Sequence, residues 1–266
     1  MSTVVAALDV STTAPAVLRT AHAIADVLGA EVEAVHVREG DHTDRVVALA
    51  RDAGVPLRVV DGDPSAEIVE ALDRAEAVLG VVGARGEPSG PSPAGHVAST
   101  VAQRCAVPLL VVPPSMPDGE AGEAAIRRAL VPLEGSEHST ACLAPTLRDL
   151  ADGGVELVAV HVFDARTVPR FRDQPAHADT SYATEFASRW CDDPPVEVHL
   201  VRGSAPAAVL DAAEEHGVDL IVLGWHRDLW SSDRAPVVRS ALALADVPVL
   251  LLSPGSIDGA EPDGEG

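Results

Sequence analysis

The sequence repeats itself, and this repeat limits the possible folds more than any other feature. The stretch VVAALD at residues 4–9 returns as ALVPLE at 129–134, and VEAVHV at 32–37 returns as LVAVHV at 157–162. Further along, AVLGVVG at 77–83 matches DLIVLG at 219–224, and VPLLVVPP at 107–114 matches VPVLLLSP at 247–254. A chain of 266 residues is long enough for two domains. We therefore expect two copies of one domain.

Within each copy, short apolar runs alternate with helical patterns. The runs are rich in Val and Leu, which is typical of parallel strands that are buried on both faces. We expect helices at residues 14–29, 41–53, 64–75 and 95–106, and again at 144–150, 180–190, 206–216 and 237–245. Five strands with helices between them predict a doubly wound α/β domain with a parallel five-stranded sheet, a Rossmann-like fold present in tandem.

The composition between and after the repeats suggests the domain limits. We expect a first domain at 1–114, a linker at 115–126 that is rich in Pro, Gly and acidic residues, and a second domain at 127–255. The final segment, residues 256–266, is acidic and Gly-rich, and it is expected to be disordered.

The charge and residue usage exclude several classes of function. All 19 basic residues are Arg against 41 acidic residues, which gives a net charge of −22. Without Lys, the chain has no P-loop lysine, no protein-kinase lysine and no Schiff-base amine. The negative charge disfavours nucleic acids and anionic membranes as partners. Halophilic adaptation would also produce acidity, but the scarcity of Lys, Asn, Ile, Phe and Tyr favours the composition of a GC-rich genome as the explanation.

Cysteines and apolar runs suggest an ordinary intracellular protein. The three cysteines, Cys105, Cys142 and Cys191, show no CxxC spacing, so neither a disulfide framework nor a zinc site is indicated. No apolar run approaches the length of a membrane span, and the first residues lack a basic signal region. A cytoplasmic location is therefore expected.

The order of several short motifs carries a family resemblance. The first strand ends in acid-x-Ser, the second in His-Val, a Gly-x-Pro-x-x-x-Ile turn spans residues 62–68, and the fourth strand ends in Gly-x-Arg-Gly. Related features recur in the second copy. The sequence resembles a tandem universal stress protein over nearly its whole length. The resemblance implies strand order 3-2-1-4-5 in each domain and a pseudo-dimer whose final strands meet edge to edge or face to face.

Family members that bind ATP share a glycine-rich loop of the form G-x-x-G-x9-G-[ST] after strand 4. Here Gly83 and Gly86 begin the motif, and Gly95 and His96 end it, with a spacer one residue shorter and His in place of the hydroxyl residue. Such glycines let backbone N–H groups approach phosphate, and the last one opens a helix whose N-terminus attracts anions. Arg85 could pair with a phosphate, and His96 could donate a hydrogen bond to one.

The resemblance also implies further ligand contacts. Asp9 matches the acid beside the nucleoside, where it would accept a hydrogen bond from a ribose hydroxyl, and Val37 matches the residue whose backbone faces adenine. Val97 follows His96 in the first helical turn. Mg²⁺ or Mn²⁺ on the phosphates is implied by the resemblance alone. All seven Phe, Tyr and Trp residues lie in the second copy, so adenine in the first copy would pack on aliphatic walls.

The second copy departs from the motif and is not expected to bind nucleotide. Arg227 stands where the second glycine belongs, Ala235 and Pro236 replace the last glycine and its neighbour, and Glu134 replaces the strand-1 aspartate. Bulky side chains would fill the phosphate cradle, and proline has no N–H to donate.

Each signal also has a purely structural interpretation. The loop could be an ordinary surface loop, and Asp9 could mark a strand end before a helix capped by Ser11 or Thr12. The recurring His36 and His161 fit structural histidines better than metal ligands. No nucleophile, base and orienting acid stand at recognisable spacing.

Three hypotheses about function remain: a regulatory stress-response protein that binds an adenine nucleotide, a nucleotide-free module with an unknown protein partner, and a slow ATP hydrolase. The sequence also leaves open whether the chain forms a homodimer.

Overall fold

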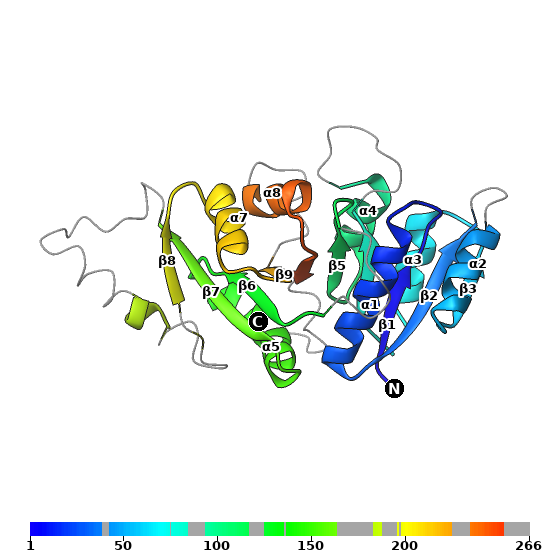
Figure 1. Ribbon diagram of the computed structural model, residues 1–266, viewed down its shortest axis with the longest axis horizontal. Coiled ribbons are helices and arrows are strands. Elements are labelled where there is room, and N and C mark those ends of the chain that lie inside the picture. The colour runs from blue at the N-terminus through cyan, green and yellow to red at the C-terminus, as the bar shows by residue number, and fades with distance from the viewer. Residues whose placement is uncertain are drawn as a thin grey trace, which may run out of the picture.

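The computed structural model confirms two doubly wound α/β repeats (Figure 1). It describes residues 1–38, 43–74, 76–84, 94–116, 125–135, 137–163, 183–187, 196, 198–224 and 235–252. The predicted linker and tail, 115–126 and 256–266, lie mostly or wholly outside these ranges, so the domain limits stay a prediction.

The first repeat alternates strands and helices as the sequence predicted. Its elements are β1 (Thr3–Ala7), α1 (Ala14–Leu28), β2 (Glu31–Val37), α2 (Thr43–Asp52), β3 (Leu57–Val60), α3 (Pro64–Leu72), β4 (Ala77–Gly83), α4 (His96–Arg104) and β5 (Leu109–Val112). Local chemistry sets several of the helix ends. The Asp63 side chain accepts the N–H of Ala66 at 2.9 Å and caps α3, while Gly29 ends α1 with φ of 60°.

The second repeat has the same order of strands. Its elements are β6 (Arg128–Pro132), α5 (Glu137–Asp152), β7 (Glu156–Phe163), β8 (Val198–Arg202), α7 (Ala205–Glu215), β9 (Leu220–Gly224), α8 (Pro236–Leu244) and β10 (Val249–Leu252), with a further helical turn at 183–187. The helix expected at 144–150 begins earlier, at Glu137, so Pro145 lies inside it. Proline in a helix interior removes a backbone hydrogen bond and is usually disfavoured, so this helix departs from the local preference.

The two sheets join into one. The strand order is β3-β2-β1-β4-β5-β10-β9-β6-β7-β8, so each repeat has the expected order 3-2-1-4-5. The junction is antiparallel, with Leu250 opposite Leu110, and both side chains are fully buried. The final strands therefore meet edge to edge, and each removes the exposed edge of the other.

Helices cover both faces of the ten-stranded sheet and form two apolar layers that extend across both repeats. One layer packs α1, α2 and α5 on the sheet, and the other packs α3, α4, α7 and α8. In the first layer α1 contacts α5 across the junction, where Val27 lies against Gly153. Cys105 is buried at the end of α4. The repeats thus share a continuous core.

Candidate functional site

A cavity of about 290 Å³ lies in the first repeat, beyond the carboxyl ends of β1 and β4. Five segments line it, namely residues 7–10, 35–37, 82–84 and 95–98 and the α3 residues Pro64 and Ile68. This is the point where the strand order reverses, because β1 lies between β2 and β4. Open α/β sheets bind ligands at this crevice.

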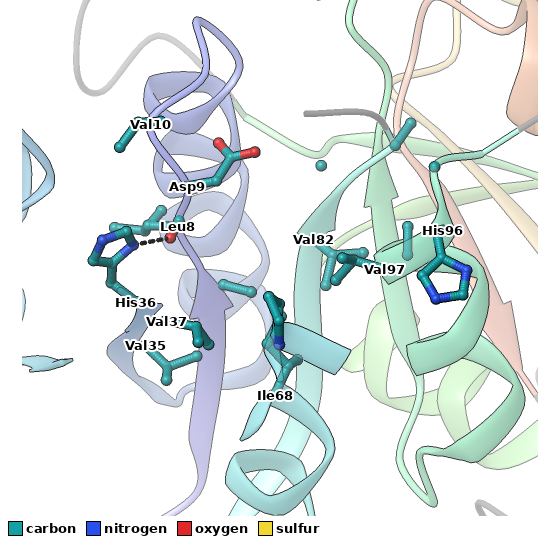
Figure 2. Close-up of a pocket in the computed structure, with 16 residues that line it drawn as sticks. Leu8, Asp9, Val10, Val35, His36, Val37, Ile68, Val82, His96 and Val97 are labelled. Atoms are coloured by element: carbon teal, nitrogen blue, oxygen red, sulfur yellow. Dashed lines mark hydrogen bonds between the residues drawn. The ribbon is translucent and has the colours of Figure 1, made fainter. Parts of the chain in front are cut away.

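The walls of the cavity are aliphatic. Val35 and Val37 on β2 and Val82 on β4 face it together with Ile68 from α3, and all four are nearly completely buried (Figure 2). Among the described lining residues, the only aromatic rings are those of two histidines. A planar apolar group would therefore pack on branched aliphatic side chains, as the distribution of aromatic residues in the sequence predicted.

Asp9 supplies a carboxylate at one rim. It follows β1 and is exposed, and its side chain accepts the N–H of Ser11 at 3.0 Å and the Ser11 hydroxyl. The Ser11 hydroxyl in turn accepts the N–H of Thr13 at 3.2 Å. Thr13, not Ser11 or Thr12, is the N-cap of α1, and its side chain makes no capping bond. Asp9 therefore stabilises the turn before α1 and still presents its carboxylate to the cavity.

The N-terminus of α4 forms the opposite rim. Gly95 is the N-cap, with φ of −63° and ψ of 165°, and no side chain caps the helix. The first N–H groups of a helix have no partners within it. Those of His96 and Val97 are therefore donors at the edge of a cavity that both residues line. The rim thus combines uncapped amides with the positive end of a helix dipole.

The ends of the glycine-rich loop are joined at this rim. The N–H of Ala84 donates to the carbonyl of Val112 at 2.7 Å, and the N–H of Gly95 donates to the carbonyl of Ala84 at 2.7 Å. Gly83 and Gly95 therefore come together as the motif predicted. Arg85 and Gly86 lie outside the described residues, so their predicted contacts stay a prediction.

His96 lies at the α4 rim of the cavity, and its contact with a phosphate stays a prediction. It is exposed, and Figure 2 shows its ring turned away from Asp9 on the far side of the α4 terminus. A ring in this position would have to rotate about its side-chain bonds to meet a ligand that also touches Asp9.

The matching region of the second repeat is built differently. Glu134 is exposed after β6, Pro236 is the first residue of α8, and Ala235 is its N-cap. One amide of the first turn is therefore missing. Trp225 and Arg227 lie outside the described residues, so the expected loss of nucleotide binding in this repeat stays a prediction.

Sequence reasoning did not assign several lining residues to the site. Leu8, Val10, Val82 and Ala98 line the cavity without belonging to any motif, and His36 was interpreted only as structural. Their positions follow from strand parity and helix packing. Pro64 and Ile68 carried a signal, because both belong to the turn motif at 62–68.

The described residues offer no preformed metal cage and no membrane span. No group of three His, Cys, Asp or Glu residues meets in the part of the chain that the structure covers. A divalent ion would therefore depend on ligand phosphates, with Asp9 as the nearby carboxylate. None of the described helices is both long and apolar enough to cross a bilayer.

The fold and the cavity define a class of protein, a duplicated doubly wound α/β protein with a ligand crevice at the switch point of its first repeat. The universal stress protein family model matches residues 44–113 and 125–253. The chain belongs to the universal stress protein family. No curated protein matches it significantly.

Solved structures of similar length share this fold. A universal stress protein from Archaeoglobus fulgidus is 17% identical at a TM-score of 0.59, with 94% of this chain and 96% of that chain covered. A putative universal stress protein from Pseudomonas aeruginosa is 14% identical at 0.62, with 97% and 95% covered. A functionally unknown protein from the same species is 12% identical at 0.65, with 97% and 94% covered. At these identities the likeness establishes the fold alone.

Proposed function

We propose that this chain is a regulatory member of its family that binds an adenine nucleotide in the cavity of the first repeat. The observation that carries the proposal is the pairing of two rims across an aliphatic crevice. Asp9 offers a carboxylate on one side, and the uncapped N-terminus of α4 offers amides on the other. This arrangement suits a ligand with an apolar ring, a hydroxyl-bearing middle and an anionic end.

The charge of the protein affects how such a ligand would be held. The net charge is −22, and the described cavity lining contains one carboxylate and no arginine. A triphosphate would therefore be repelled at long range. Mg²⁺ or Mn²⁺ on the phosphates would reduce this repulsion, and Arg85 is the cation within the glycine motif. We expect binding to weaken when the metal is removed.

Isothermal titration calorimetry tests the proposal directly. Adenosine, AMP, cAMP, ADP and ATP would be titrated into the full chain, the phosphorylated ligands with and without Mg²⁺. Gly95→Val tests the α4 rim, because its extended backbone angles accept a β-branched residue while the side chain would cover the amides. Asp9→Asn tests the opposite rim, and Glu134→Gln is the matched control in the second repeat.

We expect the wild-type chain and Glu134→Gln to bind with equal affinity, and Gly95→Val to lose binding. The proposal is wrong if no ligand produces heat at millimolar concentration, a result that would favour the nucleotide-free interaction module. Binding that persists in Gly95→Val would place the ligand elsewhere. Phosphate release above a protein-free control, lost in Gly95→Val, is the requirement for calling the protein a hydrolase.

A further inference from the structure

His36 is a buried polar residue next to the ligand cavity. Its side chain is 2% exposed, and its Nδ1 lies 2.8 Å from the carbonyl oxygen of Leu8 (Figure 2). A carbonyl can only accept, so Nδ1 carries the proton and donates. The other ring nitrogen, Nε2, is buried and has no hydrogen-bond partner among the described residues. The bond to Leu8 is therefore the polar interaction that accounts for a histidine at this position.

This bond completes the attachment of β1 to β2. The N–H of Leu8 donates to the carbonyl of Val35 at 2.9 Å, and the carbonyl of Leu8 accepts from His36. Both polar groups of Leu8 are thus held by consecutive residues of β2. Leu8 is 3% exposed, so water cannot readily replace the histidine as a donor.

Asp9 follows directly after this attachment. The hydrogen bonds that hold the next residues are more exposed: the N–H of Ser11 donates to the Asp9 carboxylate, and Arg45 donates to the carbonyl of Val10 at 3.4 Å. Exposed bonds of this kind compete with water and restrain the chain weakly. The His36 bond is therefore the buried restraint nearest to the carboxylate at the cavity rim.

The second repeat contains the same bond without the intact motif. His161 Nδ1 lies 2.8 Å from the carbonyl of Leu133, and the N–H of Leu133 donates to the carbonyl of Val160 at 2.8 Å. His161 also packs against Phe186, with ring centroids 4.4 Å apart. The chain thus provides its own control for the structural effect of losing such a histidine.

We propose that His36 is a positioning residue of the ligand site, which holds the Leu8 carbonyl through Nδ1 and so fixes the peptide that presents Asp9. The inference rests on the proposed function for its effect on ligand affinity. It also predicts an effect on the free protein, where Asp9 is held by the same bond whether or not a nucleotide binds.

Three variants separate positioning from folding. His36→Leu removes the donor and keeps an apolar side chain of similar volume, whereas His36→Asn restores an N–H donor near the position of Nδ1. His161→Leu removes the equivalent bond in the second repeat, together with its ring contact to Phe186. Urea unfolding of each variant first establishes that the fold persists and how much stability has been lost.

Ligand affinity gives the first readout. We expect His36→Leu to raise the Kd of the nucleotide bound by the wild-type chain about fivefold, the effect of one lost hydrogen bond. His36→Asn should recover most of this loss, and His161→Leu should bind like the wild type. Because His36 acts through Asp9, the double variant Asp9→Asn/His36→Leu should bind no more weakly than Asp9→Asn alone.

Amide hydrogen exchange in the free protein gives the second readout. The Ser11 N–H donates to Asp9, so its exchange reports whether the Asp9 turn is held. We expect faster exchange at Ser11 in His36→Leu and unchanged exchange in His161→Leu. Equal exchange in all variants would overturn the inference even if no nucleotide binds. Equal affinity of His36→Leu and wild type would overturn it even if the proposed function is correct.

Discussion

Gly153 in the second repeat packs closely against Val27 of α1 in the first, and replacing it tests how the repeats are held together. Its backbone adopts ordinary angles, with no positive φ. A Cβ atom at this position would lie 2.4 Å from the carbonyl oxygen of Val27 and 2.6 Å from its Cγ1. Real Cβ atoms do not approach other atoms within 3.0 Å. The α1 backbone would therefore have to move by at least half an ångström. Backbone shifts that an added side chain forces on a packed core are destabilising.

We expect Gly153→Ala to lower the free energy of unfolding by about 2 kcal/mol, within the range for overpacking. Gly154 is the matched control, because its φ is 84° and nothing lies within 4 Å of an added Cβ. Gly154→Ala should cost about 1 kcal/mol, the strain of a left-handed residue with a side chain. Backbone strain alone would predict the reverse order, since Gly153 has no positive φ and Gly154 does.

Urea unfolding followed by far-UV circular dichroism measures both variants. The transition midpoint and slope together show whether the two repeats still unfold as one unit. If Gly153→Ala is no less stable than Gly154→Ala, the close packing of α5 on α1 does not hold in solution. A biphasic transition in Gly153→Ala alone would show that this contact couples the repeats.

Three further predictions concern the sheet and the site. Leu250→Ala should lower the free energy of unfolding by about 2–5 kcal/mol, as for other fully buried leucines. Leu110 lies opposite Leu250 at the junction, so adding Leu110→Ala should cost less than that substitution costs alone. Urea unfolding of the two single variants and the double variant measures the difference. Asp219→Ala should lower the free energy of unfolding by about 2 kcal/mol, because one carboxylate oxygen accepts the N–H groups of Arg127 and Arg128 at 2.9 and 3.0 Å. Asp219→Asn keeps an oxygen acceptor and should retain part of this stability. Thermal unfolding of the two variants measures the difference. Asp9→Asn should weaken nucleotide binding in calorimetry while Glu134→Gln does not, and equal losses in both would contradict a site confined to the first repeat.

Much of the fold could be predicted from the sequence. The strands and most helices lie where apolar runs and helical patterns indicated, because the buried face of each element requires apolar residues at regular intervals along the chain. Pro64 begins α3 and Pro206 lies in the first turn of α7, as first-turn prolines should. The clearest error is the start of α5, which lies at Glu137 and not at the expected position 144.

The candidate site could be predicted only in part. The glycine motif and the strand-1 acid brought Gly83, Gly95 and Asp9 to one cavity. The sequence did not reveal that the His96 ring is turned away from Asp9, since a side-chain rotamer depends on neighbours from several segments. It also left His36 as a structural histidine, because its hydrogen-bond partner, Leu8, lies 28 residues away.

The two copies of one α/β unit and the divergence of their glycine motifs could be predicted from the sequence alone, because the hydrophobic periodicity and the repeated motif spacing are properties of the residue order. How the copies meet depends on contacts between residues far apart in the chain, and it could be seen only in the folded structure. The runs PLLVV and PVLLL are apolar on both faces and suit edge-to-edge or face-to-face packing equally. The choice depends on backbone groups of β5 and β10 that pair only when both repeats are folded, and this pairing turned two sheets into one.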